Sequence, residues 1–436
     1  MKRSIIYLLC AVCGFWSCEN KDETVFEKTA DERLNEALGA YEKQLSGAQY
    51  GWNAVVYPGG GGSYGFYMKF DDKNRVGMYS DFSLESGKTI KESSYRLKAM
   101  QTPTLIFDTY GYLHVLADPD GNINDGADGD GLLSDFEFTI YPDSVTTDRM
   151  AFVGRKNKSK LVLTRATQAE QTAFNAGALA NAKAFDNISK YQVYFKRITL
   201  GGVTYELSAN PVSRTIKLTW LDGNTAKEFN TSYYYTSSGL VFTNPLVNGS
   251  NRITGFTNIG WDASKLQVSV TANGANTVIG TAAKPLIVNR TAAREWWDAP
   301  VSSGGEWRTV EGFKVNGVED AFGLKDLTSD SFPYVVYLYI PAYGSGYDLF
   351  APAFIEDGGL SLHYGDAVRT PTFVNDGRII FSNAGTLGAV PTTGPVAKTS
   401  AQLYDANGYY LIQTSEKTYD MVSAKDGKAW VSWFRR

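Results

Sequence analysis

The sequence predicts a mainly β protein, built from antiparallel β-meander, barrel or sandwich domains with a few short helices at the domain entrances. Segments in which apolar and polar residues alternate are frequent along the chain, and tight-turn dipeptides separate them. Helical spacing of apolar residues is confined to three short segments. Parallel strands need a long crossover, usually a helix, between successive strands, so the scarcity of helices favours antiparallel pairing.

Two stretches illustrate the strand pattern. Ile216, Leu218 and Trp220 alternate with polar residues before Asp222-Gly223, and Leu266, Val268 and Val270 alternate before Asn273-Gly274. Asn-Gly and Asp-Gly pairs tolerate the positive φ that two-residue hairpin turns demand. Four more such pairs lie at Asn316-Gly317, Asp376-Gly377, Asn407-Gly408 and Asp426-Gly427.

Three predicted helices divide the chain. Thr29 with Glu32, and Thr167 with Glu170, have the spacing of a capping box, which satisfies free backbone N–H groups at a helix start. The first helix carries an apolar stripe of Leu34, Leu38, Tyr41 and Leu45. The second helix is expected to run to about Phe185. A third, shorter helix begins near Thr291 and carries Trp296 and Trp297. The predicted domains are therefore residues 30–165, 166–290 and 291–436.

The N-terminus predicts export. Lys2 and Arg3 precede an uncharged apolar run from Ile5 to Trp16, which is shorter than the roughly 20 residues of a membrane span. Residues 1–17 therefore match a signal peptide. Ser17-Cys18 resembles a bacterial lipobox, which makes Cys18 the predicted lipidation site and residues 18–29 a polar tether. The alternative is an ordinary secretory signal with an incidental cysteine.

Cysteine and charge content narrow the class of protein. The three cysteines, Cys10, Cys13 and Cys18, all precede the predicted domains, so the mature chain has no pair for a disulfide. Without Lys2 and Arg3, 40 basic residues (42 − 2) face 46 acidic ones, a net charge of −6. This balance gives no basic footprint for nucleic acid.

Three segments carry a family resemblance: GWNAVVYP with the following GGGGSYGFYMKFDDKNRVGMYSD, then PTLIFDTYGYLHVLADPD, then SDFEF leading to Gly154-Arg155-Lys156. Over residues 30–165 the chain resembles Bacteroidetes surface lipoproteins catalogued as domain of unknown function 4302. The resemblance implies a lipid-anchored protein of the outer membrane, facing the cell exterior. It also implies an accessory role beside nutrient-import systems, with transporter components as partners. It supplies no catalytic residues.

The sequence contains two candidates for catalytic residues, and each also has a structural interpretation. Gly61-Gly62-Ser63-Tyr64-Gly65 matches the Gly-x-Ser-x-Gly pattern of hydrolases, which requires a strand-to-helix turn. The following residues alternate as a strand, so a hairpin loop is the preferred interpretation. His114 and His363 are the only histidines, each in a strand-like context flanked by tyrosine. We interpret both as structural, because zinc sites and Ser-His-Asp triads need further partners.

An acidic stretch from Asp118 to Asp130 is the predicted metal site. Calcium takes six to eight oxygen ligands, which a flexible loop of this composition could supply. The predicted ligands are Asp118, Asp120, Asn122, Asn124, Asp128 and Asp130, with Asp125 in the same stretch. The spacing does not follow the EF-hand, and the alternative is a solvated turn. Calcium is the only cofactor that the sequence suggests.

The sequence favours binding over catalysis. Rigid sheets with Gly-, Asn- and Asp-rich loops suit a binding scaffold, and exposed aromatic rings among the many tyrosines and tryptophans could stack on a glycan. A glycan or a peptide is the expected ligand. Two alternatives stay open: a glycan- or peptide-cleaving surface hydrolase using paired carboxylates, and an adhesive or structural surface protein.

Overall fold

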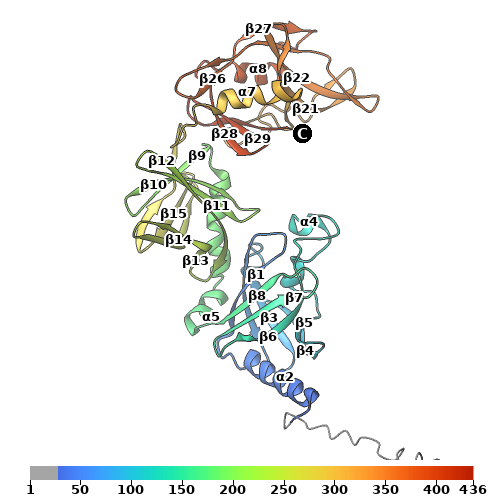
Figure 1. The fold of residues 1–436 in the computed structure, drawn as a ribbon, viewed down its shortest axis with the longest axis vertical. Coiled ribbons are helices and arrows are strands. Elements are labelled where there is room, and N and C mark those ends of the chain that lie inside the picture. Colours follow the sequence, from blue (N-terminus) through green and yellow to red (C-terminus); the bar gives the residue numbers. More distant parts are fainter. Residues whose placement is uncertain (1–27, 436) are drawn as a thin grey trace, which may run out of the picture.

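The computed structural model describes residues 28–435 as three β-sheets that follow one another along the chain, each after a helical segment. Figure 1 shows them in succession, from the blue N-terminal barrel through the green middle sheet to the orange and red C-terminal sheet. Every pairing between named strands in these residues is antiparallel, so the predicted mainly β, antiparallel fold is confirmed. The three sheets fall within the predicted ranges 30–165, 166–290 and 291–436.

The N-terminal sheet is a closed eight-stranded barrel. Helix α2 (Ala30–Ser46) precedes it, and its first and last strands pair from Trp52↔Arg165 to Tyr57↔Lys160. Alternate residues of the strands point inward, and bulky side chains such as Trp52, Phe70 and Tyr95 fill the interior. The strands are β1 (Trp52–Tyr57), β2 (Tyr64–Phe70), β3 (Arg75–Ser80), β4 (Lys91–Ala99), β5 (Pro103–Phe107), β6 (Glu137–Val145), β7 (Arg149–Gly154) and β8 (Lys160–Arg165), with short helices α3 (Tyr112–Val115) and α4 (Gly121–Asn124) between β5 and β6.

Both predicted capping boxes are present. The Glu32 amide donates to Thr29 Oγ1 at 3.2 Å, and the Thr29 amide donates to Glu32 Oε2 at 2.9 Å. Thr167 and Glu170 make the same two hydrogen bonds at the start of α5.

The second predicted helix is not continuous to Phe185. It breaks into α5 (Gln168–Asn175), α6 (Ala178–Ala182) and the 3-10 helix η1 (Lys183–Lys190). The break lies at Gly177, whose φ of +79° is left-handed and ends the first segment.

The middle sheet has nine strands, and the η1 side chains Phe185 and Ile188 join its core. Asn273 and Gly274 form the predicted two-residue turn, with φ of +49° and +78°. The predicted Asp222-Gly223 turn lies one residue later, because Asp222 pairs with Thr225 and leaves Gly223 and Asn224 as the loop. The strands are β9 (Phe195–Leu200), β10 (Val203–Asn210), β11 (Thr215–Asp222), β12 (Thr225–Thr236), β13 (Gly239–Asn248), β14 (Asn251–Asp262), β15 (Gln267–Ala272), β16 (Ala275–Val278) and β17 (Gly280–Ala282).

The C-terminal sheet has thirteen strands and packs against α7 (Ala292–Ser303) and α8 (Gly394–Leu403). Trp296 of α7 stacks on Trp307, with ring centroids 5.8 Å apart. Asn407-Gly408 is not a hairpin turn, because it connects α8 to β28. The strands are β18 (Trp307–Thr309), β19 (Phe313–Val315), β20 (Thr328–Ser329), β21 (Phe332–Gly344), β22 (Tyr347–Glu356), β23 (Gly359–Ser361), β24 (Gly365–Arg369), β25 (Thr372–Phe373), β26 (Arg378–Ile380), β27 (Asn383–Leu387), β28 (Tyr409–Ser415), β29 (Thr418–Ser423) and β30 (Ala429–Phe434).

Candidate functional site

The Gly-x-Ser-x-Gly pattern lies where the barrel meets the middle sheet. As predicted, it belongs to the hairpin between β1 and β2, with no strand-to-helix turn. Ser63 is fully buried, and its hydroxyl donates to the Tyr233 carbonyl at 3.1 Å. Gly65 lies so close to the middle sheet that a Cβ there would be 1.9 Å from the Tyr235 carbonyl oxygen. Ser63 and Gly65 at this position therefore serve packing between domains.

His114 lies in the short helix α3, not in the strand-like segment that the sequence suggested. Its Nδ1 accepts from the Gly111 amide at 3.1 Å, and its Nε2 is 3.2 Å from the Phe107 carbonyl. The ring is buried between Tyr110 and Phe136, and this burial lowers its pKa. Both nitrogens of His114 are therefore satisfied within the barrel.

His363 lies in the segment between β23 and β24 of the C-terminal sheet. Its Nδ1 is 2.9 Å from Ser329 Oγ, and its Nε2 is 3.2 Å from Glu356 Oε2. The two histidines thus lie in different domains, each with partners of its own.

The Asp118–Asp130 stretch folds around α4 and hydrogen-bonds mainly to itself. Asp118 Oδ1 accepts from the Asp120 amide at 3.0 Å, and Asp128 Oδ1 accepts from the Gly121 amide at 3.0 Å. Asn124 is buried and donates to the carbonyls of Val115 and Asp118. The remaining predicted ligands are Asn122, which donates to Asp120 Oδ1, and the exposed Asp130.

Metal binding by that stretch stays a prediction. Within residues 28–435, no group of three or more His, Cys, Asp or Glu side chains is placed to hold a metal ion. The acidic residues are therefore neighbours in sequence without forming one carboxylate cluster. Cys18, the predicted lipidation site, lies outside the described residues. Each helix in the described part of the chain is too short or too polar to cross a membrane.

A cleft of about 780 Å³ between the middle and C-terminal sheets is the candidate ligand site. One wall is the face of β9 to β12, and the other is formed by β28 and β29. The volume is within the range of small-molecule sites. Its charged lining residues are Lys196, Lys217, Lys227, Glu206, Glu228 and Asp420, and its neutral polar ones are Ser208, Thr219, Asn289, Gln413 and Thr414.

Tyr194 and Asp420 tie the two walls together. The Tyr194 hydroxyl donates to Asp420 Oδ2 at 2.6 Å, although the two residues are 226 positions apart. The Tyr194 amide also donates to the Gly427 carbonyl at 2.9 Å. Ser432 donates to the other oxygen of Asp420 at 2.6 Å. Burial raises the pKa of Asp420, and burial together with the Asp420 charge raises the pKa of Tyr194 well above its usual value.

Lys196 and Glu206 face the cleft from neighbouring strands of the middle sheet. Lys196 Nζ donates to the Tyr194 carbonyl at 3.1 Å, and burial is the main cause that lowers the pKa of Lys196, to about 8. Glu206 Oε2 accepts from the Leu286 amide at 2.8 Å, while burial raises the pKa of Glu206. Shifted pKa values in a cleft are typical of functional sites.

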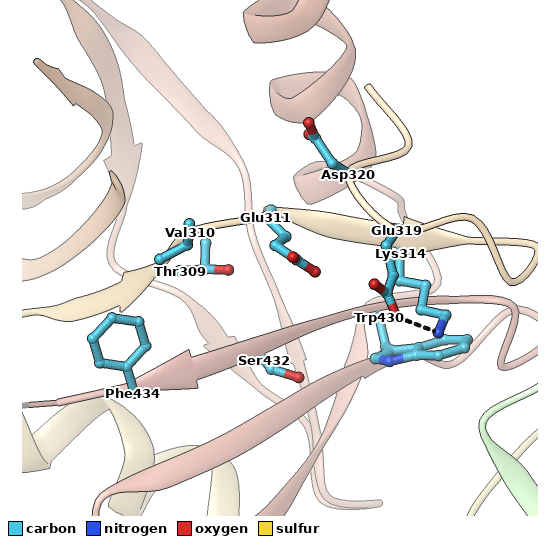
Figure 2. A pocket seen from close by; sticks show the side chains of 10 residues that line it. Thr309, Val310, Glu311, Lys314, Glu319, Asp320, Trp430, Ser432 and Phe434 are labelled. Carbon is cyan, nitrogen blue, oxygen red and sulfur yellow. Dashed lines mark hydrogen bonds and ion pairs between the residues drawn. The ribbon is translucent and has the colours of Figure 1, made fainter. Parts of the chain in front are cut away.

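A smaller hollow of about 280 Å³ adjoins the cleft. Figure 2 shows Lys314 and Glu319 above the Trp430 ring, with Ser432 farther along β30. Lys314 pairs with Glu319 at 3.0 Å and lies 5.4 Å from the centre of the Trp430 ring. Trp430 in turn contacts Tyr194, with ring centroids 5.6 Å apart, so the hollow and the cleft share one boundary.

None of these cleft residues stood out in the sequence. Glu206 and Asp420 are each flanked by apolar residues in their strands, as exposed strand residues ordinarily are, and Lys196 is followed by a second basic residue, Arg197. The only sequence signal for a site here was the presence of charged residues at these positions. A lysine or glutamate in a binding site cannot be distinguished by sequence from one on an ordinary strand surface. Only the docking of two sheets brings the three charges into a single cleft.

The comparisons with known proteins identify one family. The model of the family described as "Domain of unknown function (DUF4302)" matches residues 22–261, more than half of the chain. No curated protein matches the sequence.

Among solved structures, the octameric penicillin-binding protein homologue from Pyrococcus abyssi is 12% identical with a TM-score of 0.15. The match covers 35% of this chain and 37% of that one. The DNA polymerase III beta subunit from Thermotoga maritima is 9% identical with a TM-score of 0.13, over 92% and 98% of the two chains. Transferrin binding protein B from Neisseria meningitidis is 10% identical with a TM-score of 0.14, over 88% and 76%.

Proposed function

The chain belongs to the family described as "Domain of unknown function (DUF4302)", and we propose that it is a cell-surface lipoprotein that binds a polar nutrient without turning it over. The ligand occupies the cleft between the middle and C-terminal sheets. The observation that carries this proposal is the cleft itself, where half-buried charges, neutral hydrogen-bonding side chains and aromatic rings converge.

The mixed lining suits a polar ligand such as a glycan or a peptide. Binding sites commonly combine apolar walls with a few fixed polar groups that orient the ligand. Ile412 and Leu411 supply apolar surface, and Gln413 and Asn289 supply both donors and acceptors. The tie between Tyr194 and Asp420 holds the walls in register, which lowers the ordering cost of binding.

The cellular setting is proposed from the N-terminal sequence. A signal peptide over residues 1–17 followed by lipidation of Cys18 supports anchoring in the outer membrane, and the polar tether 18–29 supports display towards the exterior. The family resemblance supports an accessory role beside an import system, with its transporter components as partners.

A hydrolase is the second candidate, favoured by two cleft carboxylates with raised pKa values, Glu206 and Asp420. Glycosidases use such a pair as acid and base or nucleophile. Both oxygens of Asp420 already accept hydrogen bonds from Tyr194 and Ser432. A carboxylate held in this way is suited to joining the walls, and this favours binding over catalysis.

The test measures binding and turnover on the same ligands. Glycans and peptides are screened against the full-length protein in detergent, and each ligand that binds is followed chemically over long incubation. Ser208→Trp should block binding, because Ser208 lines the cleft from β10. Thr204→Trp is the matched control, because Thr204 is exposed on the same strand but does not line the cleft.

The outcomes separate the candidates. Micromolar binding that Ser208→Trp removes, with the ligand unchanged, supports the proposal. Turnover that Glu206→Gln or Asp420→Asn abolishes would establish the hydrolase instead. Binding that is equal in the Ser208→Trp and wild-type proteins would exclude the cleft as the site.

A further inference from the structure

The ammonium group of Lys196 has more N–H donors than its protein partners use. An ammonium group has three N–H donors and no acceptor. The hydrogen bond to the Tyr194 carbonyl uses one of them, and no carboxylate of residues 28–435 lies within ion-pair distance of Lys196 Nζ. Lys196 Nζ also lies 5.8 Å from the centre of the Tyr191 ring, and its hydrogen-bonding capacity beyond the Tyr194 carbonyl is available to a ligand.

The cleft carboxylates differ in how fully the protein satisfies them. Asp420 accepts from Tyr194 and Ser432, Glu206 accepts from the Leu286 amide, and Glu228 pairs with Lys217 at 2.9 Å. Asp420 and Glu228 thus have partners on their own domains or across the cleft, whereas Glu206 has one backbone hydrogen bond. Lys196, the most buried cation of the cleft, likewise has one hydrogen bond, and no ion pair with another of residues 28–435.

Burial is the main effect that disfavours the charged form of Lys196 and lowers its pKa. The charge of Lys314, in the adjoining hollow, disfavours the charged form of Lys196 more strongly than the charge of Glu206 favours it. An anionic group bound beside Lys196 would offset both costs, because opposite charges attract more strongly when partly shielded from water.

The strand arrangement disfavours an extended peptide in this cleft. Peptides that bind to sheets usually add a strand to a free edge. The strands that line the cleft, β9 to β12 with β28 and β29, are each paired on both sides. A ligand there meets the face of a sheet and its hydroxyl and amide side chains, which suits the many hydroxyl groups of a saccharide.

We propose that the cleft ligand is an acidic oligosaccharide, and that Lys196 anchors its carboxylate or sulfate group. This inference rests on the proposed function, since it names the ligand class of the same cleft. The neutral side chains Ser208, Thr219 and Gln413 hydrogen-bond the sugar hydroxyls around that anchor.

The experiment compares saccharides that differ in charge. Calorimetry on the full-length protein in detergent uses oligogalacturonate, its carboxyl-reduced neutral counterpart, and a heparin-derived oligosaccharide as the sulfated probe. Lys196→Gln removes the anchor charge and Lys196→Arg keeps it. Lys265→Gln is the control, because Lys265 is an exposed lysine that pairs with Asp262 at 3.2 Å and does not line the cleft.

The expected result is tighter binding of at least one acidic probe than of the neutral one, by about tenfold or more, as for a hydrogen bond to a charged group. Lys196→Gln should abolish this preference, whereas Lys196→Arg and Lys265→Gln should retain most of it. The carboxylated and sulfated probes show which anion the anchor accepts.

Two results would overturn the inference in distinguishable ways. Equal binding of the neutral and acidic probes, blocked by Ser208→Trp, would leave the cleft as a binding site and remove the anionic requirement. Absence of binding by all three saccharides would also reject an acidic saccharide, while the wider screen of glycans and peptides decides the proposed function separately.

Discussion

Arg214 and Asp81 form a buried ion pair that joins the barrel to the middle sheet. Arg214 Nη1 lies 2.6 Å from Asp81 Oδ2, and the two side chains are 4% and 0% exposed. Arg214 also donates to the carbonyls of Ser63 and Asp81, and Asp81 accepts from the Tyr235 amide at 2.8 Å. The ion pair thus anchors a network of hydrogen bonds across the interface.

Loss of the arginine should destabilise the protein strongly. Removal of one partner from a buried ion pair leaves an uncompensated charge and typically costs about 3–5 kcal/mol. We expect Arg214→Met to lower the free energy of unfolding by that amount in urea denaturation. The exposed pair Lys217–Glu228 is the control, because Lys217→Met should cost less than about 1 kcal/mol. Similar losses for both variants would contradict this role for Arg214.

Asp366 and Asp348 are buried diagonal neighbours on β24 and β22, and their substitution should have opposite effects. Asp366 Oδ2 has no hydrogen-bond partner among the described residues. Asp348 accepts from Trp297 Nε1, the Tyr339 hydroxyl and the Ala342 amide, at 2.5–2.7 Å. At neutral pH, Asp366→Asn should stabilise the protein by about 1 kcal/mol, while Asp348→Asn should destabilise it by a similar amount, because it loses an acceptor.

The effect of Asp366→Asn should depend on pH. Burial raises the pKa of Asp366 above its unfolded value of 3.8. Between these two pKa values the folded state binds more protons than the unfolded state, so ionisation of Asp366 lowers the free energy of unfolding as pH rises. Above the folded pKa this penalty is constant. Thermal melts from pH 3 to pH 8 should therefore show a gain from Asp366→Asn that grows with pH and then levels off. A gain in melting temperature that is constant over this pH range would contradict the raised pKa of Asp366.

The calcium prediction for Asp118–Asp130 can be tested by melting. A ligand that binds only the native state stabilises it by mass action. If the stretch binds calcium with an affinity of about 0.1–1 mM, millimolar calcium should raise the melting temperature. Asp120→Ala with Asp128→Ala should remove that rise, measured against the same variant in chelator because both carboxylates also hydrogen-bond within the loop. Identical wild-type melts in calcium and chelator would reject the prediction.

The lipid anchor can be tested by fractionation. If Cys18 carries the lipid, Cys18→Ala should move the protein from the membrane fraction to the soluble fraction with its melting temperature unchanged. The replacement is expected to leave the fold intact because residue 18 precedes the first described helix, which begins at Ala30. A Cys18→Ala protein that stays in the membrane fraction would show another mode of attachment.

Local features of this protein were determined by the sequence alone. The capping boxes at Thr29 and Thr167, the turn at Asn273-Gly274 and the alternation of Ile216, Leu218 and Trp220 each depend on residues a few positions apart. Backbone geometry and nearby hydrogen bonds decide such features, so the antiparallel β class could be predicted. The break at Gly177 was missed, because a glycine can either continue or end a helix.

The tertiary structure decided which of the many polar residues matter. Arg214 and Asp81, or Tyr194 and Asp420, look like ordinary surface residues of their strands and loops until two sheets meet. Their burial, their partners and the raised or lowered pKa values around the cleft arise from contacts between segments far apart in sequence. Conversely, the Gly-x-Ser-x-Gly and acidic patterns were conspicuous in sequence, yet both Ser63 and Asp128 have backbone partners in the folded protein. For Ser63 the reason is that a buried polar group must be hydrogen-bonded.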